Sequence, residues 1–278
     1  MTGGRSIDSC PGAPAAKGDG QGLNRVIRLR ASAGEVRAAI EDDFHHFRVS
    51  VQHDGDRVTG VEADALRQPF SLCRAAGNRL EALVGERLVR DTTLFFRHHD
   101  ALLQCTHQFD LATLAIAMAA RGTGVRKYHA FVEDQGEAAT GRHAILRRDD
   151  VDLLSWRFLD GVIEAPGRYC GRALGRGFTA WAGTSLCTEL AEAALVLRRA
   201  VFISNGRGRT VELDRAPHAS PRGGCWVQQP ERAPFALRQK GTSLDFSQRS
   251  DLLTADDEQW LAFGAPGIAL SAAVRDSI

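Results

Sequence analysis

The sequence lacks any long run of apolar residues. No stretch of its 278 residues approaches the ~20 consecutive apolar positions that a membrane-spanning helix requires. Residues 1–22 also lack the apolar segment of a secretory signal. They are rich in Gly, Pro and Ala and bury too little apolar area to offset the entropy of ordering. We therefore expect a disordered leader over residues 1–24 and a cytoplasmic protein.

Strong net charge and paired cysteine motifs are absent as well. The net charge is +1 at pH 7, so neither nucleic acid nor an anionic membrane is an expected partner. The six cysteines are scattered and form no CxxC pair, which excludes a zinc ribbon and a thioredoxin motif. Hydrophobic residues make up 44% of the chain and charged residues 25%, as in globular proteins. The expected partner is a small molecule, and a homo-oligomer stays open.

The first half of the chain predicts a meander of strands followed by two helices. Alternating residues over 25–65 include an Asp-Gly hairpin turn at Gly55. Residues 73–88 and 105–122 have helical spacing, and each segment begins with a cysteine. This order predicts an α+β domain over residues 25–124, with both helices on one face of the sheet.

The second half predicts strands again and then one more helix. Strand-like segments lie at residues 126–134, 142–150 and 153–165. A helix is predicted over residues 185–202. We expect these elements to form a second β-rich lobe over residues 125–205, closed by the helix. Beyond it, residues 206–278 are polar with little periodicity and predict an extended C-terminal arm.

Two of the predicted helices open with the same dipeptide. Cys105-Thr106 and Cys187-Thr188 each precede a largely apolar helix. Two unrelated amphipathic helices are the simpler explanation of this echo, and an internal repeat is the alternative.

The helix that begins near Cys105 carries the residues most suggestive of chemistry. Backbone N–H groups at a helix start favour a thiolate, the form of cysteine that binds metal or attacks carbon. His107 lies in the same turn as Cys105, so the two side chains can converge on one point. A buried structural cysteine beside a capping histidine is the alternative.

An acidic segment upstream completes the predicted site. Asp43 and His45 alternate in register with the apolar residues of the strand that follows, so both are expected to face the core. A buried aspartate requires a partner or a cation. The predicted ligand set for one zinc or iron ion is Asp43, Cys73, Cys105 and His107. His45 and His46 are the predicted catalytic residues, because a free imidazole titrates near neutrality and can move protons.

A stretch rich in glycine, arginine and aromatic residues suggests contacts with a substrate. It contains GRYCGRALGRG, which lacks the GK[ST] of a P-loop, so no nucleotide cofactor is expected. Its arginines can clamp an anionic group and its aromatic residues can line a pocket, although core packing is their default role. The predicted substrate-binding residues are Arg168, Tyr169, Arg172 and Trp181.

Two longer stretches of the first half follow a known pattern. They are EDDFHHFRVSVQHDGDRVTGVEADALRQPFSLCRAAGNRLEALVGERL and LLQCTHQFDLATLAIAMAAR. In order, they match a meander, a cysteine-headed helix and a final helix, so residues 34–122 resemble the IscU, SufU and NifU iron–sulfur scaffold family. The resemblance implies an IscU-like fold with Asp43, Cys73 and Cys105 at the family's ligand positions. The family's first cysteine falls on Glu41, so one cluster thiolate is lost, and the remaining ligands are compatible with a mononuclear metal site.

A second resemblance covers residues 25–205. The motifs that carry it are EDD-x-H, R-x-P-x₃-C-x₂-A-x₃-L-x₂-L-x-G and QCTH-x-FDLA. With these motifs the chain resembles a bacterial family known as domain of unknown function 2889. Members of that family accompany aromatic-compound catabolism, which implies a small aromatic substrate.

Together these features predict a metal-dependent enzyme. It would be a lyase or hydrolase that uses a mononuclear zinc or iron ion on a small aromatic compound. The alternatives are a sulfur or iron–sulfur carrier with Cys105 as its acceptor thiolate, and a metal-stabilised small-molecule binding protein. The second lobe favours the enzyme, because a bare scaffold needs no pocket wall.

Overall fold

An eight-stranded antiparallel sheet is the centre of the computed structural model, which describes residues 20–136 and 141–263. The strand order is β4-β3-β2-β1-β5-β6-β7-β8, and every neighbouring pair is antiparallel. The strands are β1 (Gly22–Ser32), β2 (Glu35–Asp42), β3 (His46–His53), β4 (Val58–Arg67), β5 (Gly124–Glu133), β6 (Arg142–Arg148), β7 (Val151–Leu159) and β8 (Val162–Ala165). The predicted α+β class is confirmed.

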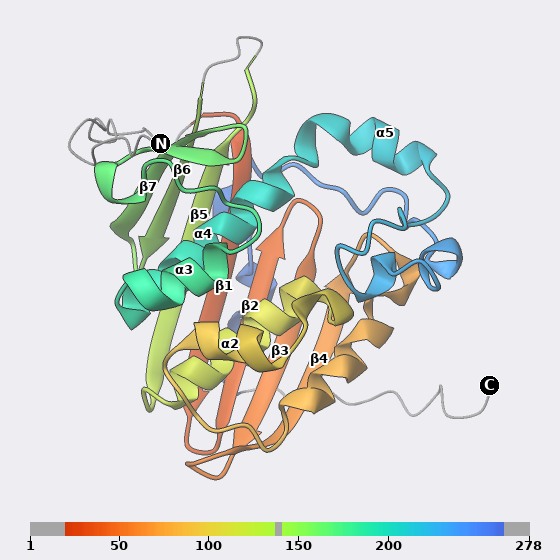
Figure 1. Ribbon diagram of the computed structural model, residues 1–278. Coiled ribbons are helices and arrows are strands. Elements are labelled where there is room, and N and C mark those ends of the chain that lie inside the picture. The colour runs from red at the N-terminus through yellow and green to blue at the C-terminus, as the bar shows by residue number, and fades with distance from the viewer. Residues whose placement is uncertain (1–19, 137–140, 264–278) are drawn as a thin grey trace.

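The longer helices cover one face of this sheet. The α-helices are α1 (Phe95–His98), α2 (Thr106–Ala119), α3 (Phe178–Ser185), α4 (Thr188–Ser204), α5 (Thr210–Arg215) and α6 (Glu258–Leu261). Helix α2 packs on β1, β2 and β3, and α4 packs on β1 and β5 to β7. Figure 1 shows both helices in front of the sheet, with the last described residues, in dark blue, behind it. The sheet is therefore covered on both faces.

The two halves of the chain repeat one plan. Each half is a four-stranded antiparallel meander followed by a helix whose N-cap is a cysteine, Cys105 for α2 and Cys187 for α4. The start of α2 pairs with the end of α4 through Asp110 and Arg199, and Arg121 beyond the end of α2 pairs with Glu189 at the start of α4. The two helices are thus antiparallel, as are β1 and β5 where the halves meet. The two Cys-Thr dipeptides therefore occupy equivalent positions in an internal structural repeat.

Alternation along the strands decides which side chains form the core. Phe47, Val49 and Val51 of β3 are fully buried against α2, as the sequence predicts. Residues of opposite parity, such as Arg37 and Ala39 of β2, face the other side of the sheet. One apolar cluster runs continuously under both α2 and α4. Residue 124, the predicted boundary between the two lobes, therefore lies within one continuous sheet, at the start of β5.

The segment over residues 73–88 differs from its prediction. In place of an α-helix it forms two 3₁₀ segments, Ser71–Cys73 of 3 residues and Ala75–Leu83 of 9 residues. Gly77 packs so closely that a Cβ there would lie 3.1 Å from the Cβ of Ala63 on β4. A glycine with this close contact weakens a regular helix and favours tight, irregular turns. The hairpin turn at Gly55 forms as predicted, between β3 and β4.

The predicted leader is too long by a few residues. Strand β1 begins at Gly22 and pairs with β5 from its first residue, so residues 22–24 belong to the sheet. Residues 1–19 lie outside the described residues. Within the part of the chain that the structure describes, no helix is long and apolar enough to cross a membrane.

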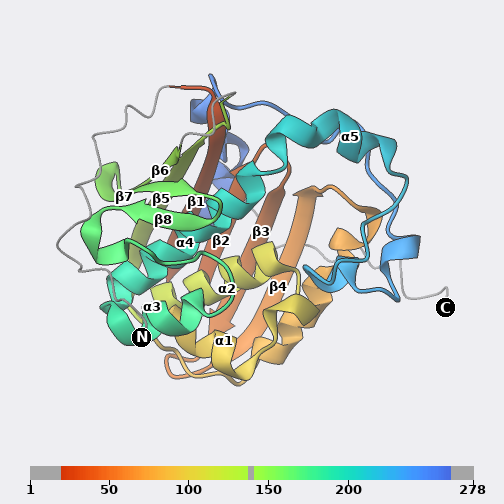
Figure 2. The ribbon, with the colours of Figure 1, turned by 45° about the horizontal axis from the view of Figure 1, so that its top comes forward.

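The C-terminal arm runs from the helix-covered face of the sheet to the other face. After α5 it passes beside the start of α2, where the backbone N–H of Trp226 donates to Gln104 O at 2.9 Å. It then crosses the turn after β2, and Phe246 packs with Val26 while Trp260 packs with Ala39. Figure 2 shows α5 and this arm beside the β3–β4 edge of the sheet. Residues 264–278 of the predicted arm lie outside the described residues.

Phe47→Ala should lower the free energy of unfolding by about 3–5 kcal/mol, because it leaves a cavity in the shared core. Phe235→Ala is the matched control, since this ring is 72% exposed and its loss should change stability by less than about 0.5 kcal/mol. Chemical denaturation measures both values. Equal effects of the two substitutions would contradict this assignment of the core.

Candidate functional site

A tight turn between β2 and β3 holds the central side chains of the site. The backbone N–H of Asp42 donates to His45 O at 2.9 Å. In return, Oδ1 of Asp42 accepts hydrogen bonds from the backbone N–H groups of Phe44 (2.8 Å) and His45 (3.0 Å). One buried carboxylate therefore closes the turn and fixes the backbone of His45.

The same carboxylate orients the His45 ring. Nδ1 of His45 lies 2.9 Å from Oδ1 of Asp42, and Arg25, directly opposite on β1, pairs with Oδ2. Burial by itself would raise the pKa of Asp42, but His45 and Arg25 outweigh it and hold that pKa below its usual range. The anionic carboxylate favours a proton on Nδ1, which leaves Nε2 of His45 as the acceptor.

A second imidazole stacks on the first. His107, in the first turn of α2, has its ring centroid 3.9 Å from that of His45, with 28° between the ring planes. Burial lowers the pKa of both rings; for His107, the nearby His45 and Arg25 lower it further. Both rings are therefore neutral at pH 7, the form that accepts a proton.

The two imidazoles open into a pocket of about 720 Å³. Its wall combines the β2–β3 turn, the start of α2, the end of α4 and the C-terminal arm. The main lining residues are Phe44, His45, Phe70, His107, Phe202, Arg209, Leu213, His218, Arg222 and Arg238. This volume suits a small-molecule ligand, and the wall is apolar with a few polar groups, as ligand sites commonly are.

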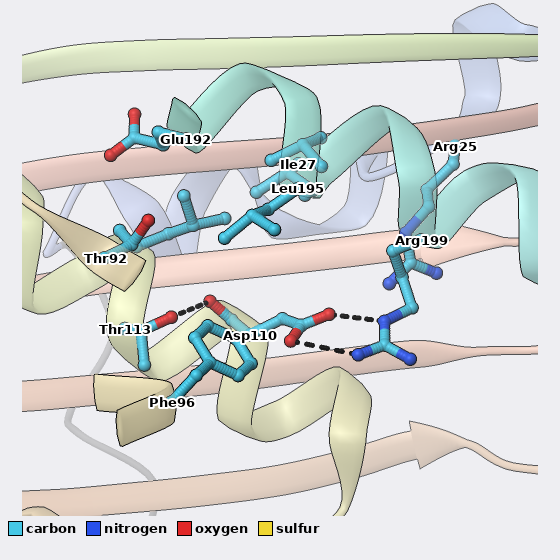
Figure 3. Close-up of a pocket in the computed structure, with 11 residues that line it drawn as sticks. Arg25, Ile27, Thr92, Phe96, Asp110, Thr113, Glu192, Leu195 and Arg199 are labelled. Carbon is cyan, nitrogen blue, oxygen red and sulfur yellow. Dashed lines mark hydrogen bonds and ion pairs between the residues drawn. The ribbon is translucent and has the colours of Figure 1, made fainter. Parts of the chain in front are cut away.

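A layer of buried charge lies near His107, between α2 and α4. Arg199 of α4 donates two hydrogen bonds to Asp110 of α2, at 2.5 and 3.2 Å, and Figure 3 shows this pair with Arg25 beside it. The cavity that these residues line has a volume of about 20 Å³, enough for one water molecule. Two buried guanidinium nitrogens of Arg25, Nε and Nη2, have no protein partner among the described residues. A water in this cavity is suited to satisfy them.

The structure does not bring the four predicted metal ligands together. Asp43 lies at the top of the turn, where its carboxylate pairs with Arg207 and accepts the backbone N–H of Phe246 at 3.1 Å. Among residues 20–136 and 141–263, no group of three or more His, Cys, Asp or Glu side chains is arranged to hold a metal ion. The reason is the turn itself: β2 ends at Asp42, so Asp42 and not Asp43 takes the inward position.

The two predicted cysteine ligands are buried thiols. Cys73 and Cys105 are 6% and 4% exposed, and neither lines the pocket. Burial raises the pKa of Cys73, and it raises the pKa of Cys105 to about 12. These shifts argue against the expected thiolate at the start of α2, because the cost of burying the charge exceeds the stabilisation from the helix N-terminus.

His46, predicted as catalytic, faces the opposite side of the sheet from His45. Its Nε2 lies 2.9 Å from Asp257 of the arm, and its Nδ1 lies 3.5 Å from Glu41. Neighbouring residues of a strand point to opposite faces, so His45 and His46 cannot share one site. His46 instead fastens the arm to the sheet.

The predicted substrate-binding residues lie around β8 and α3 and do not line the pocket. Tyr169 is buried between the rings of Trp156 and Trp181, at centroid distances of 5.7 and 6.1 Å. The Arg172 guanidinium lies 4.5 Å from the centroid of Trp181. Arg168 belongs to the 3₁₀ turn that carries Tyr169. These residues form a packing cluster, the default that the sequence allowed.

Sequence reasoning missed Asp42, Arg25 and the arm's share of the pocket. Asp42 could have been found, since an aspartate that precedes a short turn commonly accepts backbone N–H groups two and three residues on. Arg25 carries no local signal, because its partner is set by the pairing of β1 with β2. Arg209 and Arg222 lie in a segment without periodicity.

Comparison of the sequence with known protein families finds no family that matches it, and comparison with curated proteins finds no match. The function is therefore inferred from the site itself.

Stability should fall as the pH drops below about 6.5, the ordinary pKa of histidine. The folded pKa values of His45 and His107 lie below that value, so the unfolded chain binds more protons in acid. Denaturant titrations at about pH 7.5 and pH 5.5 measure the loss, and His107→Gln should reduce it. Ring pKa values at or above the ordinary one, read by NMR titration, would contradict the burial of these imidazoles.

Cys105 should resist alkylation at pH 8, because almost none of a thiol with a pKa of about 12 is ionised there. Exposed Cys187, the N-cap of α4, is the internal control and should react first with iodoacetamide. Peptide mass spectrometry follows each site over time. Modification of Cys105 as fast as Cys187 would restore the thiolate prediction.

Proposed function

We propose that this chain is an enzyme that performs acid–base chemistry on a small molecule held in the 720 Å³ pocket. The observation that carries the proposal is the Asp42–His45 pair. A buried carboxylate holds Nδ1 of His45 at 2.9 Å, and the ring lines the pocket. A histidine oriented by a carboxylate beside a ligand-sized cavity is a recurring arrangement for a general base.

His45 is the residue that moves the proton. Nε2 accepts a proton from the bound substrate or from a water molecule beside it, and the Asp42 carboxylate stabilises the imidazolium that forms. The same nitrogen then returns the proton to the leaving group, so His45 ends each cycle neutral. This cycle serves either of the expected reaction types, a lyase that removes a proton from carbon or a hydrolase that activates water.

The stacking of His107 on His45 allows only one of the two imidazole rings to be protonated at a time. With centroids 3.9 Å apart, two imidazolium ions would repel strongly. The neutral His107 ring also walls off one side of His45 and limits its access to water. We therefore assign His107 a positioning role next to the base.

The proposal uses no metal ion, because Asp43, Cys73, Cys105 and His107 do not fit as a ligand set. Asp43 is engaged by Arg207, and both cysteines are buried thiols with raised pKa values. The same burial disfavours the sulfur-carrier alternative, since an acceptor cysteine must be reached by its donor. We propose that residues 34–122 keep the architecture of the iron–sulfur scaffold family without its chemistry.

A binding protein without turnover is the second candidate. The pocket favours it as much as it favours an enzyme, and the small aromatic ligand implied by the second family resemblance suits the phenylalanine side chains of the wall. The Asp42–His45 pair favours the enzyme, because ligand binding alone needs no oriented base.

Turnover of a panel of small aromatic esters and hydroxy acids, followed by mass spectrometry, tests the proposal. His45→Gln should lower kcat/KM by about 100-fold to 10,000-fold, because it removes the group that accepts the proton. His98→Gln changes an exposed histidine outside the pocket and should leave kcat/KM unchanged. Full activity in folded His45→Gln protein would refute the role of the base, and binding without turnover in the parent chain would favour the binding protein.

A further inference from the structure

Charge on the pocket wall has only one sign. The charged lining residues are Arg209, Arg222 and Arg238, beside the imidazoles of His45, His107 and His218. No Asp or Glu side chain among the described residues lines the pocket. The overall chain is almost neutral, with 35 Lys and Arg against 34 Asp and Glu, so this concentration of positive charge is local. A cavity with cationic walls raises the local concentration of anions.

The three arginines differ in how far the protein already engages them. Arg238 is buried and pairs with Asp214 at 2.7 Å. Arg209 pairs with Glu212 at 3.3 Å, but both side chains are exposed and such a pair contributes little. Arg222 is exposed, and no carboxylate of the described residues forms an ion pair with it. Arg209 and Arg222 therefore have guanidinium N–H groups to offer a ligand.

Three phenylalanine rings line the same pocket as these arginines and the two stacked imidazoles. Phe44, Phe70 and Phe202 line the same pocket, and Phe202 is 37% exposed, unusual for a ring of its size. His45 is only 8% exposed, whereas Arg209 and Arg222 are exposed and so lie on the solvent side of the pocket. A ligand that contacts the rings and the exposed arginines together needs an apolar body and one polar end.

We propose that the substrate is a small amphipathic anion, with an aromatic or acyl body against the phenylalanine rings and a carboxylate or phosphate group bound by Arg222 and Arg209. This inference rests on the proposed function, since it takes the pocket beside His45 as the substrate site. Guanidinium groups bind carboxylate and phosphate oxygens with paired hydrogen bonds, which orients the bound molecule. The anchor at the rim turns the opposite end of the substrate toward Nε2 of His45.

Calorimetric titration with benzoate, phenyl phosphate and benzamide tests the inference without turnover. Benzamide has the shape of benzoate and no charge. Both anions should bind roughly 10-fold more tightly than benzamide, and Arg222→Gln combined with Arg209→Gln should remove that difference. The affinity for benzamide should stay unchanged. Arg79→Gln, an exposed arginine outside the pocket, is the matched control and should bind all three as the parent chain does.

Each outcome separates this inference from the proposed function. Equal binding of benzoate and benzamide, or binding of neither, would overturn the anionic substrate and leave the role of His45 to its own test. Anion-selective binding that survives in the double arginine variant would also overturn it, because the anchor would lie elsewhere. Preference for phenyl phosphate over benzoate, lost in that variant, would support the anchor and identify the anionic group as phosphate. Arginine-dependent binding of anions by a chain whose turnover survives His45→Gln would contradict the proposed function alone.

Discussion

The Asp42 carboxylate is the interaction on which the site depends. It ends β2, closes the turn with two backbone hydrogen bonds, orients His45 and neutralises Arg25. Each partner of this buried ion pair is less than 2% exposed. Removing one member of such a pair typically costs about 3–5 kcal/mol, because the other charge stays buried without compensation. The orientation of His45 and the stability of the β2–β3 turn therefore both depend on the Asp42 carboxylate.

The arm holds the same turn from the outside. The backbone N–H of Leu244 donates to Asp43 O at 2.8 Å, and Arg207, before α5, pairs with the Asp43 carboxylate. Burial raises the pKa of Asp43 to about 6, although Arg207 opposes the shift. Arg67 of β4 donates to Asp42 O at 2.5 Å and so ties the turn to the sheet. The segment that forms much of the pocket wall thus also restrains the residue that carries the chemistry.

The two halves share one plan, yet the start of α2 and the start of α4 differ in their contacts. At the start of α4, in the second half, buried Glu192 pairs with Arg121 and Arg126 and accepts a hydrogen bond from Tyr128. These contacts pair the buried Glu192 carboxylate fully within the protein, as in a structural hydrogen-bond network. At the start of α2, in the first half, His107 and His45 face a pocket instead. The same plan therefore gives one closed end and one open end.

The sequence by itself determined most of the strands, the two long helices and the inner face of the sheet. Alternation identified Phe47, Val49 and Val51 as core residues, and periodicity located α2 and α4, because both signals depend on neighbours along the chain. It also identified His45 and His107 as candidate functional residues.

Only the tertiary structure decided how those residues combine. A four-residue turn shifted the inward position from Asp43 to Asp42, and burial kept Cys105 a thiol. The pairing of β1 with β2 brought Arg25 to Asp42, and the arm brought Arg222 to the pocket. These contacts join residues far apart in sequence, so no local pattern in the chain could reveal them.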